Sequence, residues 1–230
     1  MEERGRLHEN IREKSGQHIK TISIVGSSHA RNLTKAIRKN KLYENYIIDD
    51  MTLPGARMSK IAKNWPYEKI AKMSSEDCLI LMALGNDMFE EGSHIITKNP
   101  KMIHLKHFSK ETAEIAIEEF TKACTQLRDL VKELVPKVYI CNNSFRYLCA
   151  CPQHQYQGFI AHQAQTNRIL DEIISPVARV LRIDRLIADK YSHRNYSIQE
   201  QAKWLVDGVH LHPHLYRRLA DNLLSVITSN

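Results

Sequence analysis

The chain has 230 residues, of which 43% are hydrophobic and 26% are charged, and its formal net charge is +7. This length suits one α/β domain with a sizeable core, and no apolar run approaches the roughly 20 residues of a membrane-spanning helix, which excludes that class. Residues 1–20 are highly charged and lack the apolar segment of a secretory signal, so we expect a cytoplasmic protein, with a nuclear location also open.

The first predicted elements are a strand, a helix and a second strand. A β-branched run at 21–25 ends at Gly26 and predicts a buried strand. A helix is expected from about 30 to 39, a strand at 46–49, and a turn at 53–55, where proline and glycine are adjacent. A strand, a tight turn and a helix are typical of the opening of a βαβ unit.

A continuous apolar run at 78–84 is apolar on both faces and predicts a central parallel strand. A helix from Ser59 into the sixties precedes it. The elements expected after it are a helix at 110–134, a strand at 138–141, a turn-rich stretch at 142–160, a helix at 161–174, a strand at 177–183 and a helix at 213–227. Five strands alternating with helices imply a parallel sheet covered on both faces. We expect one domain at 21–230 after a charged N-terminal extension at 1–20.

Residues with catalytic chemistry lie at the ends of these elements. Ser28 follows the first strand, Asn86 follows the third, and Asp207 and His210 precede the last helix. In open α/β sheets, reacting groups gather beyond the carboxyl ends of the strands. We therefore expect these side chains to converge on one edge of the sheet.

The residue types match nucleophilic catalysis. A serine hydroxyl needs a base to take its proton, a neutral histidine can do this near pH 7, and a carboxylate can orient the histidine ring. The sequence predicts Ser28 as nucleophile, with His210 and Asp207 as its activating pair. The expected oxyanion donors are the N–H groups of Ser28 and Gly55 and the side-chain amide of Asn86.

Four blocks of sequence resemble, in order, those of the SGNH (GDSL-like) hydrolase superfamily. They are IVGSS at 24–28, LPGA at 53–56, LGND at 84–87 and DGVH at 207–210. The resemblance covers about residues 21–228 and implies a three-layer α/β/α, flavodoxin-like fold with a five-stranded parallel sheet. It also implies a carboxylic ester hydrolase, often for acetyl or other short acyl groups, acting on a small molecule, lipid or acylated glycan without a metal or other cofactor.

Several residues near these blocks have alternative interpretations. Ser27 stands where the first block usually has aspartate, which leaves it as a rival nucleophile. Ser28 could serve only as a helix N-cap, and Asn86 and Asp87 could only cap the segment after them. His29 is predicted to line the substrate site, with a solvent-facing side chain as the alternative.

The five cysteines are odd in number and predict no disulfide framework, because three of them lie in apolar segments. Cys149, Cys151 and His154, with His162 further on, raise a zinc site as an alternative. Their spacing, C-x-C-x-x-H-x7-H, differs from the usual opening of structural zinc sites. We therefore expect a loop with free thiols and no metal.

The net positive charge favours anionic partners, and it leaves a second function as an alternative. A cluster of Lys35, Arg38, Lys39 and Lys41 lies near the end of the first predicted helix. The segment 26–33 (GSSHARNL) also has a looser resemblance to esterase domains in the first open reading frame of some non-LTR retrotransposons. The alternative function is a non-catalytic module that binds RNA or another polyanion, although paired RNA-reading aromatics are absent. The sequence leaves the oligomeric state open.

Overall fold

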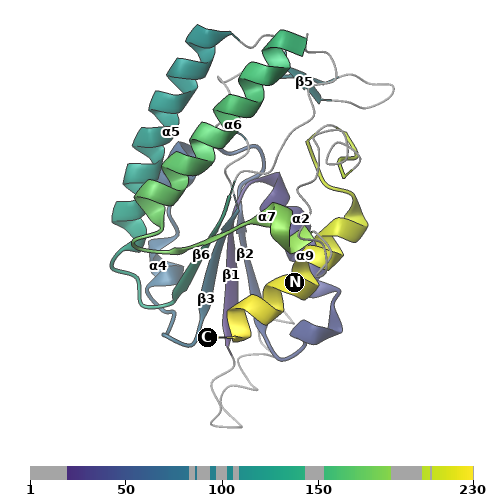
Figure 1. Ribbon diagram of the computed structural model, residues 1–230. Helices are drawn as coiled ribbons and strands as arrows, with labels where there is room; N and C mark the ends of the chain where they lie inside the picture. The colour runs from purple at the N-terminus through teal and green to yellow at the C-terminus, as the bar shows by residue number, and fades with distance from the viewer. Residues whose placement is uncertain are drawn as a thin grey trace.

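The computed structural model describes residues 20–82, 86, 94–96, 103–105, 109–142, 153–187, 204–207 and 209–229. These residues build a central sheet with helices on both faces (Figure 1). The predicted extension, residues 1–20, lies outside this part of the chain except for Lys20.

The central sheet is parallel throughout. Its strands are β1 (Thr21–Gly26), β2 (Ile47–Thr52), β3 (Cys78–Met82), β6 (Lys137–Cys141) and β7 (Arg179–Leu181). They lie side by side in the order β2-β1-β3-β6-β7, and every neighbouring pair is parallel. Taken in chain order within this sheet, that is 2-1-3-4-5, the order of flavodoxin-like folds. The predicted fold class is confirmed.

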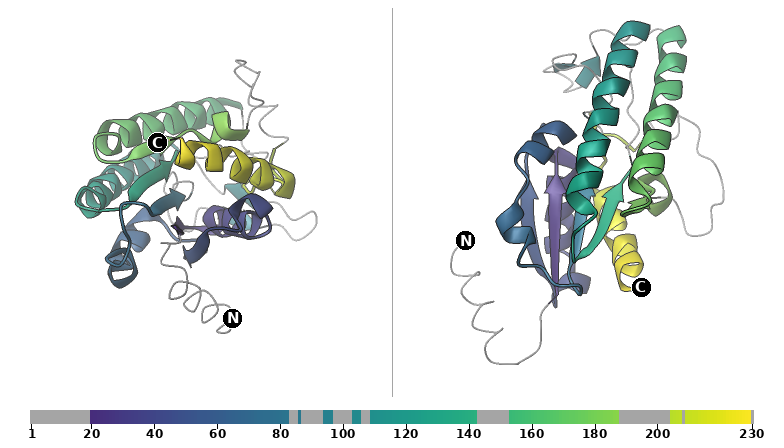
Figure 2. Two further views of the ribbon diagram at one scale, coloured as in Figure 1. Left: turned by 90° about the horizontal axis from the view of Figure 1, so that it is seen from below. Right: turned by 90° about the vertical axis from the view of Figure 1, so that its left-hand side faces the viewer.

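Helices cover the sheet on both faces, as Figure 2 shows from two further directions. The helices are α2 (Ser28–Arg38), the 3-10 turn η1 (Lys41–Tyr43), α3 (Met58–Lys63), α4 (Tyr67–Ile70), α5 (Lys110–Val131), α6 (Gln153–Ile174), α7 (Ile183–Ile187) and α9 (Pro213–Thr228). One hydrophobic core lies between the sheet and α2, α7 and α9, and a second lies between the sheet and α3, α5 and α6.

The position of β3 in the middle of the sheet explains why its sequence is apolar without alternation. Ile80 and Met82 belong to the core under α2 and α9, whereas Leu79 and Leu81 belong to the core under α5 and α6. All five residues of β3 are buried because both faces of the sheet are covered. The prediction of a central parallel strand is therefore confirmed.

Several predicted boundaries are wrong, among them those of α6 and β7. Helix α6 begins at Gln153, inside the stretch predicted to be turn-rich. The prediction missed this start because the first turns of the helix are polar and contain Gly158. Strand β7 is shorter than the predicted 177–183. The N–H groups of Val177 and Ala178 both donate to Ile174 O, at 2.9 Å each, so these two residues belong to the turn after α6 and do not join the sheet.

Two short strands were not predicted. They are β4 (His94–Ile96) and β5 (Ile103–Leu105), which pair antiparallel in a separate sheet.

Among the described helices, none is both long enough and apolar enough to cross a lipid bilayer.

Three cysteines, Cys78, Cys124 and Cys141, are buried free thiols, as their apolar segments predicted. Burial raises the pKa of Cys78 to about 11 and that of Cys141 to about 12, so both stay protonated at neutral pH. They act as small hydrophobic side chains.

Candidate active site

The turn from β1 into α2 needs a glycine and carries Ser28. Gly26 has φ +150°, and a Cβ atom there would lie 2.2 Å from the backbone oxygen of Met82 on β3. The next N–H, that of Ser27, donates to the same oxygen at 3.2 Å. Helix α2 begins one residue later, at Ser28. The close backbone approach therefore fixes Ser28 at the carboxyl edge of the sheet, beside β3.

Folding brings Ser28 to the pair that lies 182 residues further along the chain. His210 Nε2 is 2.8 Å from Ser28 Oγ. On the other side of the ring, His210 Nδ1 is 2.7 Å from Asp207 Oδ2. The Ser28 side chain is half-buried, and the exposed fractions of the His210 and Asp207 side chains are 22% and 12%. The three predicted residues thus form one continuous hydrogen-bonded chain that solvent can reach.

Asp207 is held in place by its own loop. Its Oδ1 accepts the N–H of Val209 at 3.0 Å and the N–H of His210 at 2.7 Å. Burial opposes ionisation of this carboxyl group, but the hydrogen bonds from the His210 ring and from the two N–H groups outweigh it and lower its pKa to about 2. Asp207 is therefore a carboxylate at neutral pH.

A pH-dependent loss of stability follows from this lowered pKa. The carboxyl group has a pKa near 3.9 in an unfolded chain, so the folded protein binds fewer protons there and Asp207 stabilises it above about pH 4. We expect that contribution, on the order of 2 kcal/mol, to disappear as the pH falls from about 4 to about 2. Urea unfolding of the wild type and of Asp207→Asn between pH 6 and pH 2 checks it. The stability difference between the two proteins should shrink over that window, and a constant difference would contradict the assignment.

Of the two further oxyanion candidates, Gly55 lies on a turn that is tied to β1, and Asn86 is hydrogen-bonded to that turn. Residues Leu53–Ala56 form a type II turn, with Ala56 N–H donating to Leu53 O at 3.0 Å and Gly55 at φ +73°. Leu53 N–H donates to Gly26 O at 2.7 Å, and Asn86 Nδ2 donates to Ala56 O at 3.1 Å. Gly55 is exposed, and its N–H donates to no acceptor in the described part of the chain. The first three of the four blocks thus meet at one end of the sheet.

The residues next to Ser28 have other contacts. Ser27 is the N-cap of α2, so the interpretation of Ser28 as only a cap is wrong. Ser27 is also buried, and the His210 ring bonds Ser28. The side chain of His29 is only 4% exposed, and its Nδ1 lies 2.8 Å from the Tyr216 hydroxyl oxygen. Substrate contact by His29 stays a prediction, and Asp87 lies outside the described residues.

The zinc alternative is not tested by the described residues. Within them, no group of three or more His, Cys, Asp or Glu side chains is arranged to hold a metal ion. Cys149 and Cys151 lie outside this part of the chain, as does the side chain of His154, while His162 is buried on α6.

One polar residue of this region, Tyr216 on α9, was missed by the sequence analysis. Its hydroxyl oxygen lies 2.8 Å from Nδ1 of His29 on α2. Tyr216 stands among the apolar positions of an amphipathic helix, where an aromatic residue indicates only core packing. No local signal could have marked it, because its partner His29 is 187 residues away.

Neither a protein-family model nor a curated protein matches the sequence. Solved structures do match the fold. One is an acetylxylan esterase from Geobacillus stearothermophilus, with 13% identity and a TM-score of 0.56 over 91% of this chain and 94% of that one. Another is a candidate SGNH hydrolase from Slackia heliotrinireducens, with 13% identity and a TM-score of 0.55 over 90% and 97%. A third is a candidate GDSL-like lipase from Parabacteroides merdae, with 12% identity and a TM-score of 0.57 over 93% and 97%. The chain therefore has the three-layer α/β/α fold of the SGNH hydrolases.

Proposed function

We propose that this protein is a serine esterase that hydrolyses carboxylic esters, with Ser28 as nucleophile. The observation that carries the proposal is the hydrogen-bonded chain from Ser28 Oγ through the His210 ring to Asp207, with distances of 2.8 and 2.7 Å. A serine, a histidine and a carboxylate in this geometry are the parts that acyl transfer needs. The fold shared with esterases supports the same reaction class.

In the acylation step, Ser28 Oγ attacks the acyl carbon while His210 Nε2 takes the hydroxyl proton. The resulting tetrahedral intermediate collapses, the ester C–O bond breaks, and the alcohol leaves with the proton from His210. In the second step, a water molecule gives a proton to His210 and attacks the acyl-enzyme. Collapse of the second intermediate releases the carboxylic acid and returns the proton to Ser28.

Charge develops at two places during these steps. The imidazolium of His210 is stabilised by Asp207, whose lowered pKa keeps it ionised. The oxyanion is assigned to the N–H groups of Ser28 and Gly55 and to the Asn86 side chain. Ser28 is also the first residue of α2, where unpaired N–H groups and the positive end of the helix dipole favour a negative charge.

Short acyl esters are the substrates we assign to this site. The block pattern resembles enzymes that act on acetyl and other short acyl groups, and one structural neighbour is an acetylxylan esterase. A small ester such as p-nitrophenyl acetate is therefore the first substrate to assay.

A labelled fluorophosphonate probe tests the proposal without knowledge of the natural substrate. We expect the purified chain to be labelled once, with mass spectrometry locating the adduct on Ser28, and we expect no label in Ser28→Ala. An adduct on Ser27 would contradict the choice of nucleophile. Absence of any label on the folded wild type would contradict the esterase proposal.

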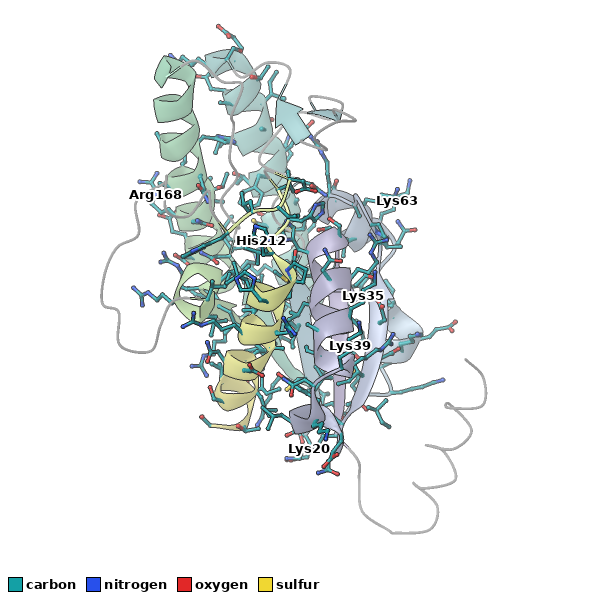
Figure 3. The ribbon with its side chains drawn as sticks, turned by 90° about the vertical axis from the view of Figure 1, so that its right-hand side faces the viewer. Lys20, Lys35, Lys39, Lys63, Arg168 and His212 are labelled. Atoms are coloured by element: carbon teal, nitrogen blue, oxygen red, sulfur yellow. The ribbon has the colours of Figure 1, made fainter. Side chains whose placement is uncertain are left out.

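A second candidate, binding of RNA or another polyanion, is favoured by the charge on α2. This helix contains no acidic residue, and the exposed Arg31 and Lys35, with Lys39 just after its end, make no ion pair within the described residues. Figure 3 shows Lys35 and Lys39 along α2, beside the α9 helix that His212 precedes. Salt-dependent retention of RNA by a chain that the probe does not label would favour this candidate over the esterase.

A further inference from the structure

The bond between Ser28 and His210 depends on how two separate parts of the chain are placed. Ser28 belongs to α2, whereas His210 belongs to the loop that leads into α9. Between α2 and α9, apolar side chains such as Leu33 and Leu219 share one core. Apolar packing is non-directional, so it does not by itself fix the position of α9 along α2 to a fraction of an ångström. Directional hydrogen bonds near the site can do so.

The Tyr216 hydroxyl makes such a hydrogen bond. Tyr216 lies in the first turn of α9 and is buried. Its hydroxyl oxygen lies 2.8 Å from Nδ1 of His29, which is on α2 directly after Ser28. This hydrogen bond therefore joins the helix of the nucleophile to the helix that follows the loop of the base.

Burial raises the pKa of Tyr216 to about 12, so the phenol keeps its proton at neutral pH. That proton can be donated to Nδ1 of a neutral His29 ring whose own proton is on Nε2.

His29 also packs against the ring of His210, so the position of the His29 ring affects that of the base. Its ring centroid lies 5.2 Å from that of His210, with 34° between the ring planes. His29 is also the residue directly after Ser28, so its backbone cannot move independently of the nucleophile. The His210 ring is thus held by Asp207 at one edge and packed against His29 on one side.

We propose that Tyr216 and His29 are positioning residues that hold the His210 ring at hydrogen-bonding distance from Ser28. This inference rests on the esterase function proposed above. Neither residue needs to touch substrate or the reacting atoms. Their effect on catalysis goes through the distance and alignment of the Ser28–His210 bond.

The chain offers a matched control for this proposal. Tyr43 in η1 is as buried as Tyr216, at 3% exposure for each, and its hydroxyl donates to Ala220 O on α9 at 2.6 Å. This bond also joins α9 to the region of α2. It lies beyond the opposite end of α2 from Ser28, because η1 follows that helix. Tyr43→Phe therefore removes a comparable hydrogen bond without touching the site.

We expect Tyr216→Phe to lower kcat for p-nitrophenyl acetate about 10- to 100-fold, because a small displacement of a reacting group has an effect of this size. KM should change little, since ground-state binding of the ester does not use the ring. Tyr43→Phe should keep the kcat of the wild type. Both variants should show a similar drop in Tm, because each loses one buried hydrogen bond.

A second measurement does not need turnover. In proton NMR spectra, the Nδ1 proton of His210 reports its hydrogen bond to Asp207, and we expect Tyr216→Phe to shift or broaden this signal while Tyr43→Phe leaves it unchanged. His29→Phe, which keeps a ring and removes the acceptor, should resemble Tyr216→Phe, and the double variant should be no worse than either.

A Tyr216→Phe protein with the kcat and the His210 signal of the wild type would overturn the positioning role. A wild type that neither hydrolyses esters nor reacts with the fluorophosphonate probe would instead overturn the esterase function. In that case the NMR comparison of the two tyrosine variants still decides whether Tyr216 places the His210 ring.

Discussion

Ser28→Ala is expected to lower kcat for ester hydrolysis by about four to six orders of magnitude, since removal of a triad serine leaves only the catalysis due to binding and the oxyanion donors. The structure gives His210 Nε2 one hydroxyl partner among the described residues, Ser28 Oγ at 2.8 Å. Without that oxygen, no covalent intermediate can form at this position. Turnover of p-nitrophenyl acetate at saturating substrate measures the effect.

The neighbouring serine provides the control for this measurement. Ser27 is buried and caps α2 through its backbone, without a hydrogen bond from its side chain to the helix. Ser27→Ala should therefore retain most of the activity, and its circular dichroism spectrum should match that of Ser28→Ala. If the activity falls with Ser27→Ala and persists with Ser28→Ala, Ser27 is the nucleophile and the assignment is wrong.

Gly26→Ala is expected to have the largest effect on stability, about 4 kcal/mol, from backbone strain and overpacking together. The new methyl group would lie 2.2 Å from Met82 O, which is backbone of the central strand and cannot rotate away. The turn would have to open, and Ser28 would move away from His210. Urea unfolding monitored by tryptophan fluorescence or circular dichroism gives the free energy of unfolding.

Gly55→Ala measures the free-energy cost of a left-handed backbone conformation without a steric clash. Gly55 also has a positive φ, +73°, but nothing lies within 4 Å of a Cβ atom built on it. Its substitution should cost only about 1–2 kcal/mol, the penalty of the left-handed conformation. Equal losses for the two variants would show that the contact with Met82 does not explain the requirement for glycine at position 26.

Most of the information that brings Ser28, His210 and Asp207 together could be read from the sequence. The apolar run of β3 predicted a strand buried on both faces, and the rule that reacting groups lie beyond the carboxyl ends of parallel strands predicted that Ser28 and His210 would meet. Both predictions depend on local composition and on chain order. Those are properties that a single sequence displays directly.

Features that depend on long-range packing were not predictable in the same way. The first turns of α6 are polar, so they read as a turn-rich stretch, and helix formation there was missed. No local sequence feature distinguishes Tyr216, because its position on α9 fits an ordinary core residue and its partner on α2, His29, is distant in sequence. Contacts of this kind are set by which helix faces which, after the sheet has formed.

The separation of 182 residues between the hydroxyl and the imidazole has a consequence for synthesis of the protein. During synthesis the ribosome releases the strand and helix that hold Ser28 before the loop of Asp207 and His210, which follows all five strands of the central sheet. A polypeptide that stops before this loop holds the serine with no base beside it. Under the esterase function proposed above, such a polypeptide cannot cleave esters.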